Sequence, residues 1–277
     1  MTLNKDDLTK VVASYQDFRT SAYASESETI RIITRLAEES DIINYRWSDR
    51  GKAPIGYIKG MAVVFASDYC KLLEGDVYAS EMAKTVTENN KNDSLVFYRE
   101  KFGKVGLHYI TRSTESLRQL FVLLLGLGMR ESSGQWFEGR DIKAKNPTSE
   151  IAEAGLFQTS WNARIVSNLL PALFEEYTQT AVGYLEIFKE GLPERTEYQL
   201  EDIGEGEGKE FQHRSKIYPS FAVEFTAIAL RNTFKHWGPI KRKEAEVLKE
   251  ADNLFLKVQR AVDHYNLHPT LRTGQPV

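Results

Sequence analysis

The chain has 277 residues, of which 42% are hydrophobic and 27% are charged, so it can bury a core of its own as one large domain or as a domain with an extension. Its 36 basic and 39 acidic residues give a net charge of −3, which argues against a nucleic-acid or anionic-membrane partner. The single cysteine, Cys70, excludes an internal disulfide, and the sequence has no cysteine and histidine spacing typical of zinc. We expect no metal and no cofactor.

The first ten residues, M-T-L-N-K-D-D-L-T-K, are polar and lack the apolar segment of a signal peptide. We therefore expect synthesis in the cytoplasm. The longest apolar run, Leu120 to Met129, is ten residues long, which is too short to span a bilayer. The sequence predicts a core helix there and no membrane insertion.

Apolar residues at helical spacing, with few strand patterns, predict a mainly α protein. In the N-terminal part we expect helices over 3–18, from the S-E-S-E-T segment at 25–29 onward, and over 59–73, 77–88 and 95–102. The segment 47–56 holds two glycines and a proline, which predicts a loop that could line a site. The polar segment E-N-N-K-N-D at 88–93 predicts a turn.

We place a boundary near residue 106. Residues 1–105 are expected to form a helical extension that packs on a main domain of residues 106–277. The main domain begins with the apolar helix, which S-S-G after Glu131 should end, with Gly134 near its C-cap.

Beyond this helix, the loop from 135 to 153 is rich in charge and turn formers, and G-L-F-Q at 155–158 is expected to be a short strand. The run E-D-I-G-E-G-E-G-K-E at 201–210 predicts a mobile loop, because it is too polar and glycine-rich to pack. Three further helices are expected: one over 162–180 with a kink or break at Pro171, one that begins at Pro219, and one over 240–264. Beyond His268 we expect an irregular tail.

Glu131 is the strongest candidate for chemistry. Stepping back from it by helical spacing gives Leu127, Leu124 and Leu120, so its carboxyl group lies on a core-facing stripe. A buried, unpaired glutamate tends to stay protonated, and the negative end of the helix dipole also raises its pKa. A neutral carboxylic acid near pH 7 is what a general acid has to be.

Two motifs link this helix to a known family. E-S-S-G at 131–134, at the end of a core helix, and G-L-F-Q at 155–158 resemble the E-S-x-G-like and G-L-M-Q signatures of lytic transglycosylases and goose-type lysozymes. The resemblance covers roughly 45 residues around the motifs. The family's third signature, an A-Y-N-A-G-like segment, is not recognisable, and the loop between the motifs is longer than in typical transglycosylases.

The resemblance implies a lysozyme-like helical domain with a small β element. It also implies cleavage of β-1,4 bonds between amino sugars, in peptidoglycan first and in chitin-type polymers second. Glu131 matches the family's catalytic general acid, and Gln158 matches the glutamine of its sugar-binding floor. Further candidates for substrate contacts are Ser133, Trp136, Phe157 and Tyr218, the last resembling loosely the tyrosine that lines the transglycosylase cleft.

The presence or absence of a second carboxylate decides between hydrolysis and transglycosylation. An inverting hydrolase needs a base about 6.5 to 9.5 Å from the acid, to activate water. Asp141 lies where goose-type lysozymes keep such an aspartate, and Glu138 and Glu153 compete with it. With no second carboxylate, Glu131 would act as acid and then as base, and the product would be the anhydro sugar of a lytic transglycosylase. Both outcomes stay open.

Less specific interpretations stand beside these. Glu131 could face solvent or pair with Arg130 or Arg140, and Trp136 and Tyr218 could be core residues. The chain could also be a non-catalytic helical interaction protein on the same scaffold. An enzyme made without a signal would need a specialised exporter, a phage lysis partner or fusion to a delivery system to reach a cell wall.

Overall fold

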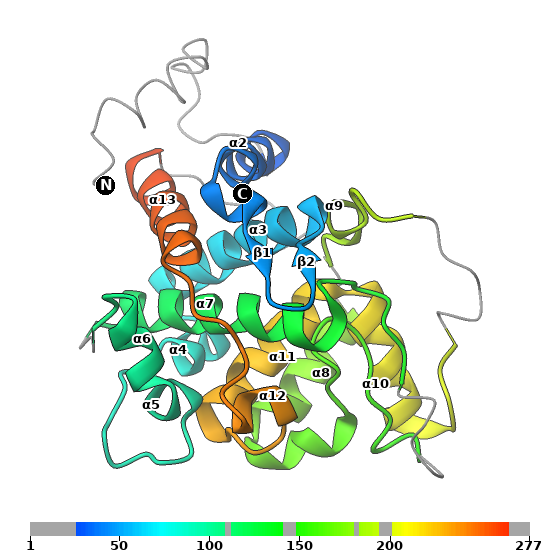
Figure 1. Cartoon of the computed structure of the whole chain (residues 1–277). Coiled ribbons are helices and arrows are strands. Elements are labelled where there is room, and N and C mark those ends of the chain that lie inside the picture. The colour runs from blue at the N-terminus through cyan, green and yellow to red at the C-terminus, as the bar shows by residue number, and fades with distance from the viewer. Residues whose placement is uncertain (1–25, 109–111, 141–147, 180–182, 194–200, 266–277) are drawn as a thin grey trace.

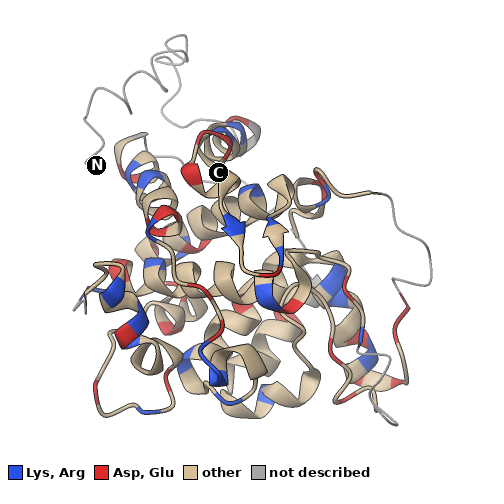
Figure 2. Cartoon of the chain, viewed as in Figure 1, with Lys and Arg blue, Asp and Glu red and all other residues tan. Residues whose placement is uncertain are grey.

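The computed structural model describes residues 26–108, 112–140, 148–179, 183–193 and 201–265 (Figure 1). The expected helix over 3–18 and the tail beyond His268 lie outside these ranges. Within them, the protein is mainly helical, as its apolar spacing predicts. Lys and Arg are scattered among Asp and Glu over the described elements (Figure 2).

Three apolar helices form the centre of the fold: α3 (Ile55–Leu73), α7 (Ser113–Ser132) and α11 (Pro219–Asn232). Each is buried around its whole circumference over most of its length, as expected for a helix that is apolar on all sides. The three pack against one another, and in Figure 1 α7 crosses the middle of the molecule with α3 above it and α11 below it. The most apolar segment of the chain therefore lies in the core, as predicted.

Shorter or more polar elements surround this centre. The amphipathic helices α2 (Glu26–Glu38) and α13 (Lys249–Tyr265) cover α3, and α8 (Leu169–Gln179) and α10 (Gly206–Ile217) cover α11. The remaining helices are α4 (Val77–Met82), α5 (Ser94–Phe97), α6 (Arg99–Lys104), α9 (Leu185–Phe188), α12 (Gly238–Lys241) and the 3₁₀ helices η2 (Asp41–Asn44) and η3 (Trp161–Val166). Buried apolar side chains from both sides of the expected boundary at residue 106 share one core.

The expected loop over 47–56 is in fact a small hairpin followed by a helix. Strands β1 (Arg46–Trp47) and β2 (Gly51–Lys52) pair antiparallel, and α3 begins at Ile55 rather than at Lys59. Trp47 anchors the hairpin because its side chain is buried in the core. The glycines and proline of this segment signal a change of direction, but they do not exclude two-residue strands.

Other N-terminal expectations differ in detail. The helix from S-E-S-E-T is confirmed as α2, and the turn at 88–93 is confirmed. The expected helix over 77–88 ends at Met82, and the one over 95–102 is divided at Tyr98 into α5 and α6. Such boundaries depend on capping, which Asp76 and Asp93 provide here at the starts of α4 and α5.

The prediction of a mobile loop over 201–210 was wrong for its second half, since α10 begins at Gly206. The glycine-rich composition serves packing here. A Cβ added at Gly208 would lie 2.5 Å from the backbone carbonyl carbon of Ser149, so the absence of a side chain permits close contact between two backbones.

Two predicted C-terminal helices are also divided. The segment 162–180 forms η3 and α8, and Pro171 lies in the first turn of α8, where its missing N–H costs no helical hydrogen bond. The segment 240–264 forms the end of α12, an irregular stretch from 242 to 248, and α13. The helix opening at Pro219 is confirmed as α11. Within the described ranges, no helix combines the length and apolar composition that crossing a bilayer requires.

Candidate active site

Glu131 lies half-buried in the last turn of α7. The helix ends directly after it, because Ser133 adopts the left-handed conformation at φ 55° and Gly134 follows at φ 76°. The amide N–H groups of Ser133 and Gly134 donate to the carbonyl oxygens of Met129 and Gly128, each at 3.2 Å. The E-S-S-G motif is thus a helix C-terminus that fixes the position of Glu131.

The pKa of Glu131 is raised from 4.5 to about 8. Burial is the largest cause, and the negative charge of Glu153 adds to it. The positive charges of Arg50 and Arg242 act in the opposite direction and lower the pKa. The carboxyl group is therefore mostly protonated at neutral pH, as a general acid requires.

Arg50 and Arg242, which act on this carboxyl group electrostatically, come from segments far from it in the sequence. Arg50, in the turn between β1 and β2, donates from Nη2 to the backbone oxygen of Arg130 at 2.5 Å. Arg242, just after α12, donates to both carboxylate oxygens of Glu244 at 2.8 and 2.9 Å. The loop over 47–56 was expected to line a site, whereas Arg242 lies in a segment predicted as a plain helix and gave no signal.

Arg130, the residue before Glu131, makes its own contacts. Its Nη1 donates to the Ser48 carbonyl oxygen at 3.2 Å, and its Nη2 lies 3.8 Å from a carboxylate oxygen of Glu244. Together with the Arg50 contact, these bonds tie the hairpin and the stretch after α12 to the end of α7. Three separate elements therefore meet around Glu131.

The second motif is docked directly on the first. The Ser132 hydroxyl oxygen lies 2.8 Å from the Leu156 carbonyl oxygen and 3.1 Å from the Gly128 carbonyl oxygen, and it accepts from the Gln135 amide at 3.2 Å. Leu156 belongs to G-L-F-Q. The residue next to Glu131 thus holds the two motifs together.

G-L-F-Q forms a turn, so the expected short strand was wrong. Its ends meet in one isolated antiparallel bridge between Ala154 and Thr159. Gly155 has φ 74°, and its amide donates to the Glu138 carbonyl oxygen at 2.8 Å. A Cβ added at Gly155 would lie 2.5 Å from the Ser215 carbonyl oxygen, so this position requires glycine on two counts.

Gln158 closes the same turn, in a left-handed conformation at φ 46°. Its side-chain amide donates to the backbone oxygens of Glu138 and Gly155, both at 3.3 Å. The side chain is half-buried and is turned back on the loop that joins the motifs. Its amide therefore links the turn to that loop.

The apolar residues of the motif region lie inside the protein. Trp136 is 6% exposed and meets Phe137 edge to face, with ring centroids 5.3 Å apart. Phe157 is 1% exposed, and its carbonyl oxygen accepts from the Trp237 indole N–H at 2.9 Å. These rings supply the apolar packing beneath the two motifs.

The other candidates are placed as follows. Tyr218 lies half-buried before α11, with its ring centroid 6.4 Å from that of Tyr177. Asp141 lies outside the described residues. Glu138 contributes its backbone oxygen to the turn, while Glu153 is exposed and acts electrostatically on Glu131. In the described ranges, no group of three or more His, Cys, Asp or Glu side chains could hold a metal ion.

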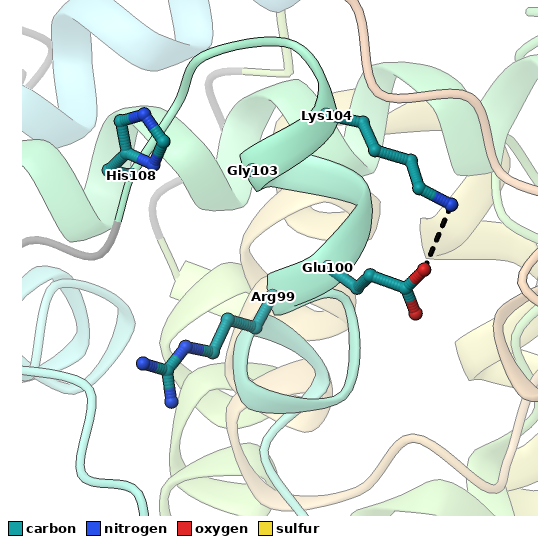
Figure 3. Close-up of a pocket in the computed structure, with 5 residues that line it drawn as sticks. All are labelled: Arg99, Glu100, Gly103, Lys104 and His108. Carbon is teal, nitrogen blue, oxygen red and sulfur yellow. Dashed lines mark ion pairs between the residues drawn. The ribbon is translucent and has the colours of Figure 1, made fainter.

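A separate open pocket of about 670 Å³ lies on α6 (Figure 3). It is lined by Arg99, Glu100, Gly103, Lys104 and His108. Lys104 and Glu100 pair across one side at 2.9 Å, so their charges compensate each other. This pocket does not include the motif residues.

No protein-family model, no curated protein and no solved structure matches this chain.

Proposed function

We propose that this protein cleaves β-1,4 glycosidic bonds between amino sugars on a lysozyme-like scaffold, with peptidoglycan as the first substrate and chitin-type polymers as the second. The observation that carries the proposal is the pKa of Glu131, which burial and Glu153 raise to about 8 at the end of a core helix. The contact between the neighbouring Ser132 and Leu156 of the second motif supports it.

In the proposed reaction, protonated Glu131 donates its proton to the glycosidic oxygen as the bond from that oxygen to the sugar C1 breaks. The leaving sugar keeps the oxygen as a hydroxyl group, and positive charge develops on the sugar ring that loses it. Glu131 becomes a carboxylate, and the charges of Arg50 and Arg242, which lower its pKa, stabilise that anion.

The second half of the reaction depends on a second carboxylate. Among the described candidates, Glu153 is exposed and its charge raises the pKa of Glu131, which supports the proposal that it activates a water molecule. Asp141 remains the candidate that the family resemblance implies. If neither serves, the Glu131 carboxylate takes a proton from a hydroxyl group of the same sugar while the oxygen of that group bonds to C1, and an anhydro product results.

We propose that Gln158 and Ser133 line the sugar site beside Glu131, because both lie in the turns that bring the motifs together. Phe157 and Trp136 contribute by packing, and the half-buried Tyr218 is a further proposed contact. A cell-wall substrate also requires delivery, which we propose occurs by specialised export or by lysis.

A non-catalytic helical interaction protein is the second candidate. The burial of Trp136 and Phe157 favours it, because buried rings offer little face on which a sugar can stack. This candidate predicts binding to a partner without release of any sugar fragment.

The test is clearing of isolated cell walls and of chitin by wild type and by Glu131→Gln, with mass spectrometry of the soluble fragments. Wild type should release disaccharide fragments, and the variant should be slower by about 10²- to 10⁴-fold, the usual contribution of general acid catalysis. A fragment lighter by one water indicates transglycosylation. Absence of fragments from the wild type would overturn the enzyme proposal, and equal clearing by both proteins would overturn the role of Glu131.

A further inference from the structure

Two carboxyl groups meet in the interior, apart from the motif region. Asp68 on α3 is 0% exposed, and Glu224 on α11 is 2% exposed. Lys71, one turn after Asp68, places its Nζ atom 2.6 Å from Glu224 Oε1 and 3.7 Å from Asp68 Oδ1. One ammonium group therefore faces two buried carboxyl groups.

The hydrogen bonds of this cluster are incomplete if both carboxyl groups are ionised. Among the residues that the structure describes, both oxygens of Asp68 and the Oε2 atom of Glu224 are buried without a hydrogen-bond donor. A buried acceptor without a donor costs about 1 to 3 kcal/mol, and a buried charge without a partner costs more. Two carboxylates would also leave one negative charge uncompensated by Lys71.

The groups around the pair do not supply the second positive charge that two carboxylates would need. The Tyr177 hydroxyl on α8 donates to the Ser220 hydroxyl at 3.1 Å, and the buried Tyr184 hydroxyl before α9 has Ser67 as its hydrogen-bonding neighbour. Asp76, at the start of α4, is a further negative group that raises the pKa of Asp68 and accepts from the amides of Tyr78 and Ala79.

Charged groups on the other elements that pack against α3 have partners elsewhere. On α13, Asp263 accepts from Tyr69 at 2.7 Å. Glu38 on α2 pairs with Lys59, which also pairs with Glu190 after α9. The balance at Asp68 therefore rests on Lys71 and Glu224.

We propose that Asp68 and Glu224 hold one proton between them, so that protonated Asp68 donates a hydrogen bond to Glu224 while the Glu224 carboxylate pairs with Lys71. The cluster is then neutral overall, and an oxygen that lacked a donor receives one. The pKa of Asp68 is consistent with this arrangement, because burial first and Glu224 second raise it well above its usual range. This proton site is independent of the proposed glycosidase activity.

The shared proton makes the contact between α3 and α11 depend on pH. In the unfolded chain Asp68 loses its proton near pH 3.9, its usual value. In the folded chain it keeps the proton to much higher pH, so this group favours folding most in acid and progressively less as pH rises. One such proton should lower the melting temperature by about 2 to 4 °C per pH unit in a chain of this size.

The first test is the melting temperature of wild type and Asp68→Asn between pH 4 and pH 9. Asparagine keeps the size of the side chain and an N–H donor for Glu224, but it cannot ionise. The variant should match wild type near pH 4 and exceed it by a margin that grows with pH. Glu224→Gln should also remove the pH slope, because Asp68 can then ionise and pair with Lys71 alone.

Asp252→Asn is the matched control. Asp252 on α13 is also buried, at 2% exposure, but Arg118 and Lys249 pair with its two oxygens at 2.8 and 2.9 Å. Its substitution should lower the melting temperature at every pH and leave the slope unchanged. A constant difference between wild type and Asp68→Asn across the range would overturn the proposal.

A second measurement does not depend on any variant that has to fold. Wild type labelled with ¹³C at the aspartate side-chain carboxyl carbons should show, by NMR, one aspartic acid that stays protonated at pH 7. Aspartate labelling excludes a contribution from Glu131. A spectrum in which every aspartate is ionised at pH 7 would contradict the shared proton.

Discussion

The Ser132 hydroxyl oxygen lies 2.8 Å from the Leu156 carbonyl oxygen, and this contact joins the end of the helix that bears Glu131 to the turn that bears Gln158. It is the direct link between the two motifs on which the functional proposal depends. The distance of 24 residues along the chain is bridged by one small side chain.

Ser132→Ala should weaken this link. The substitution removes the buried acceptor for the Gln135 amide and the donor near Leu156, which should cost about 1 to 3 kcal/mol in the free energy of unfolding, measured by urea denaturation. Cleavage activity should fall further than stability explains, because the turn moves relative to Glu131. Ser80→Ala, at an exposed serine of α4, is the control and should change neither. An unchanged Ser132→Ala protein would show that the contact positions nothing.

Gly155→Ala should destabilise the protein more than the addition of a single methyl group suggests. Gly155 and Gly106 both have φ 74°, but a Cβ at Gly155 meets the Ser215 carbonyl oxygen, whereas one at Gly106 meets nothing within 4 Å. Gly106→Ala should therefore cost only the backbone strain of about 1 to 2 kcal/mol. Gly155→Ala should cost at least twice as much in chemical denaturation. Equal losses would mean that the second motif can shift freely.

The pH dependence of cleavage should have an alkaline limb near pH 8, where Glu131 loses the proton that it donates. Arg242→Gln should move this limb to higher pH, because the charge of Arg242 lowers the pKa of Glu131. Glu153→Gln should move it to lower pH, because the charge of Glu153 raises that pKa. The measurement is the pH profile of kcat/KM on soluble wall fragments. Shifts in the same direction for both variants would contradict the electrostatic account.

Glu153→Gln also tests the second carboxylate. If Glu153 activates water, the variant should lose hydrolysis at every pH by about 10²-fold or more, beyond any shift of the alkaline limb. Retained hydrolysis at the pH optimum would leave Asp141 as the candidate base, and Asp141→Asn then becomes the decisive variant. Thermal unfolding of both variants checks that the fold is intact.

The stability of Glu131→Gln should depend on pH in a defined direction. The folded pKa of Glu131 is raised to about 8, so its contribution to stability is greatest below the unfolded pKa and declines as pH rises toward 8. The variant should equal wild type near pH 4 and be more stable by several degrees in melting temperature at pH 9. A wild type that is the more stable protein at pH 9 would indicate that Glu131 is ionised and paired.

Helices whose positions follow from the local pattern of apolar residues and prolines were predictable from the sequence. The ten-residue apolar run placed α7 in the core, and Pro219 marked the start of α11. The start of α10 at Gly206 was not predictable, because the close approach of Gly208 to the Ser149 backbone is a tertiary contact without a local sequence signal. Nor was the break after α12, where Lys243 turns with φ 56°.

The candidate site was likewise predictable only where it depends on a single element. The buried position of Glu131 follows from helical spacing within one element. Its charged neighbours Arg50 and Arg242 come from a hairpin and from an irregular stretch, so only the tertiary fold brings them near Glu131. The Asp68 and Glu224 pair had no local signal, since each residue alone looks like an ordinary charge on a helix.

Two other segments lie directly against the backbone of α7, and this contact restricts motion at the candidate site. A Cβ at Gly126 would overlap the Glu246 backbone oxygen, and one at Gly128 would overlap the Tyr57 hydroxyl group, so two other segments lie directly against the helix backbone. A helix held this closely on two sides can neither rotate nor slide without opening the core. Glu131 is therefore a fixed point, and any adjustment of shape around a bound molecule has to come from segments beside it that do not hold the α7 backbone, such as the turn between β1 and β2.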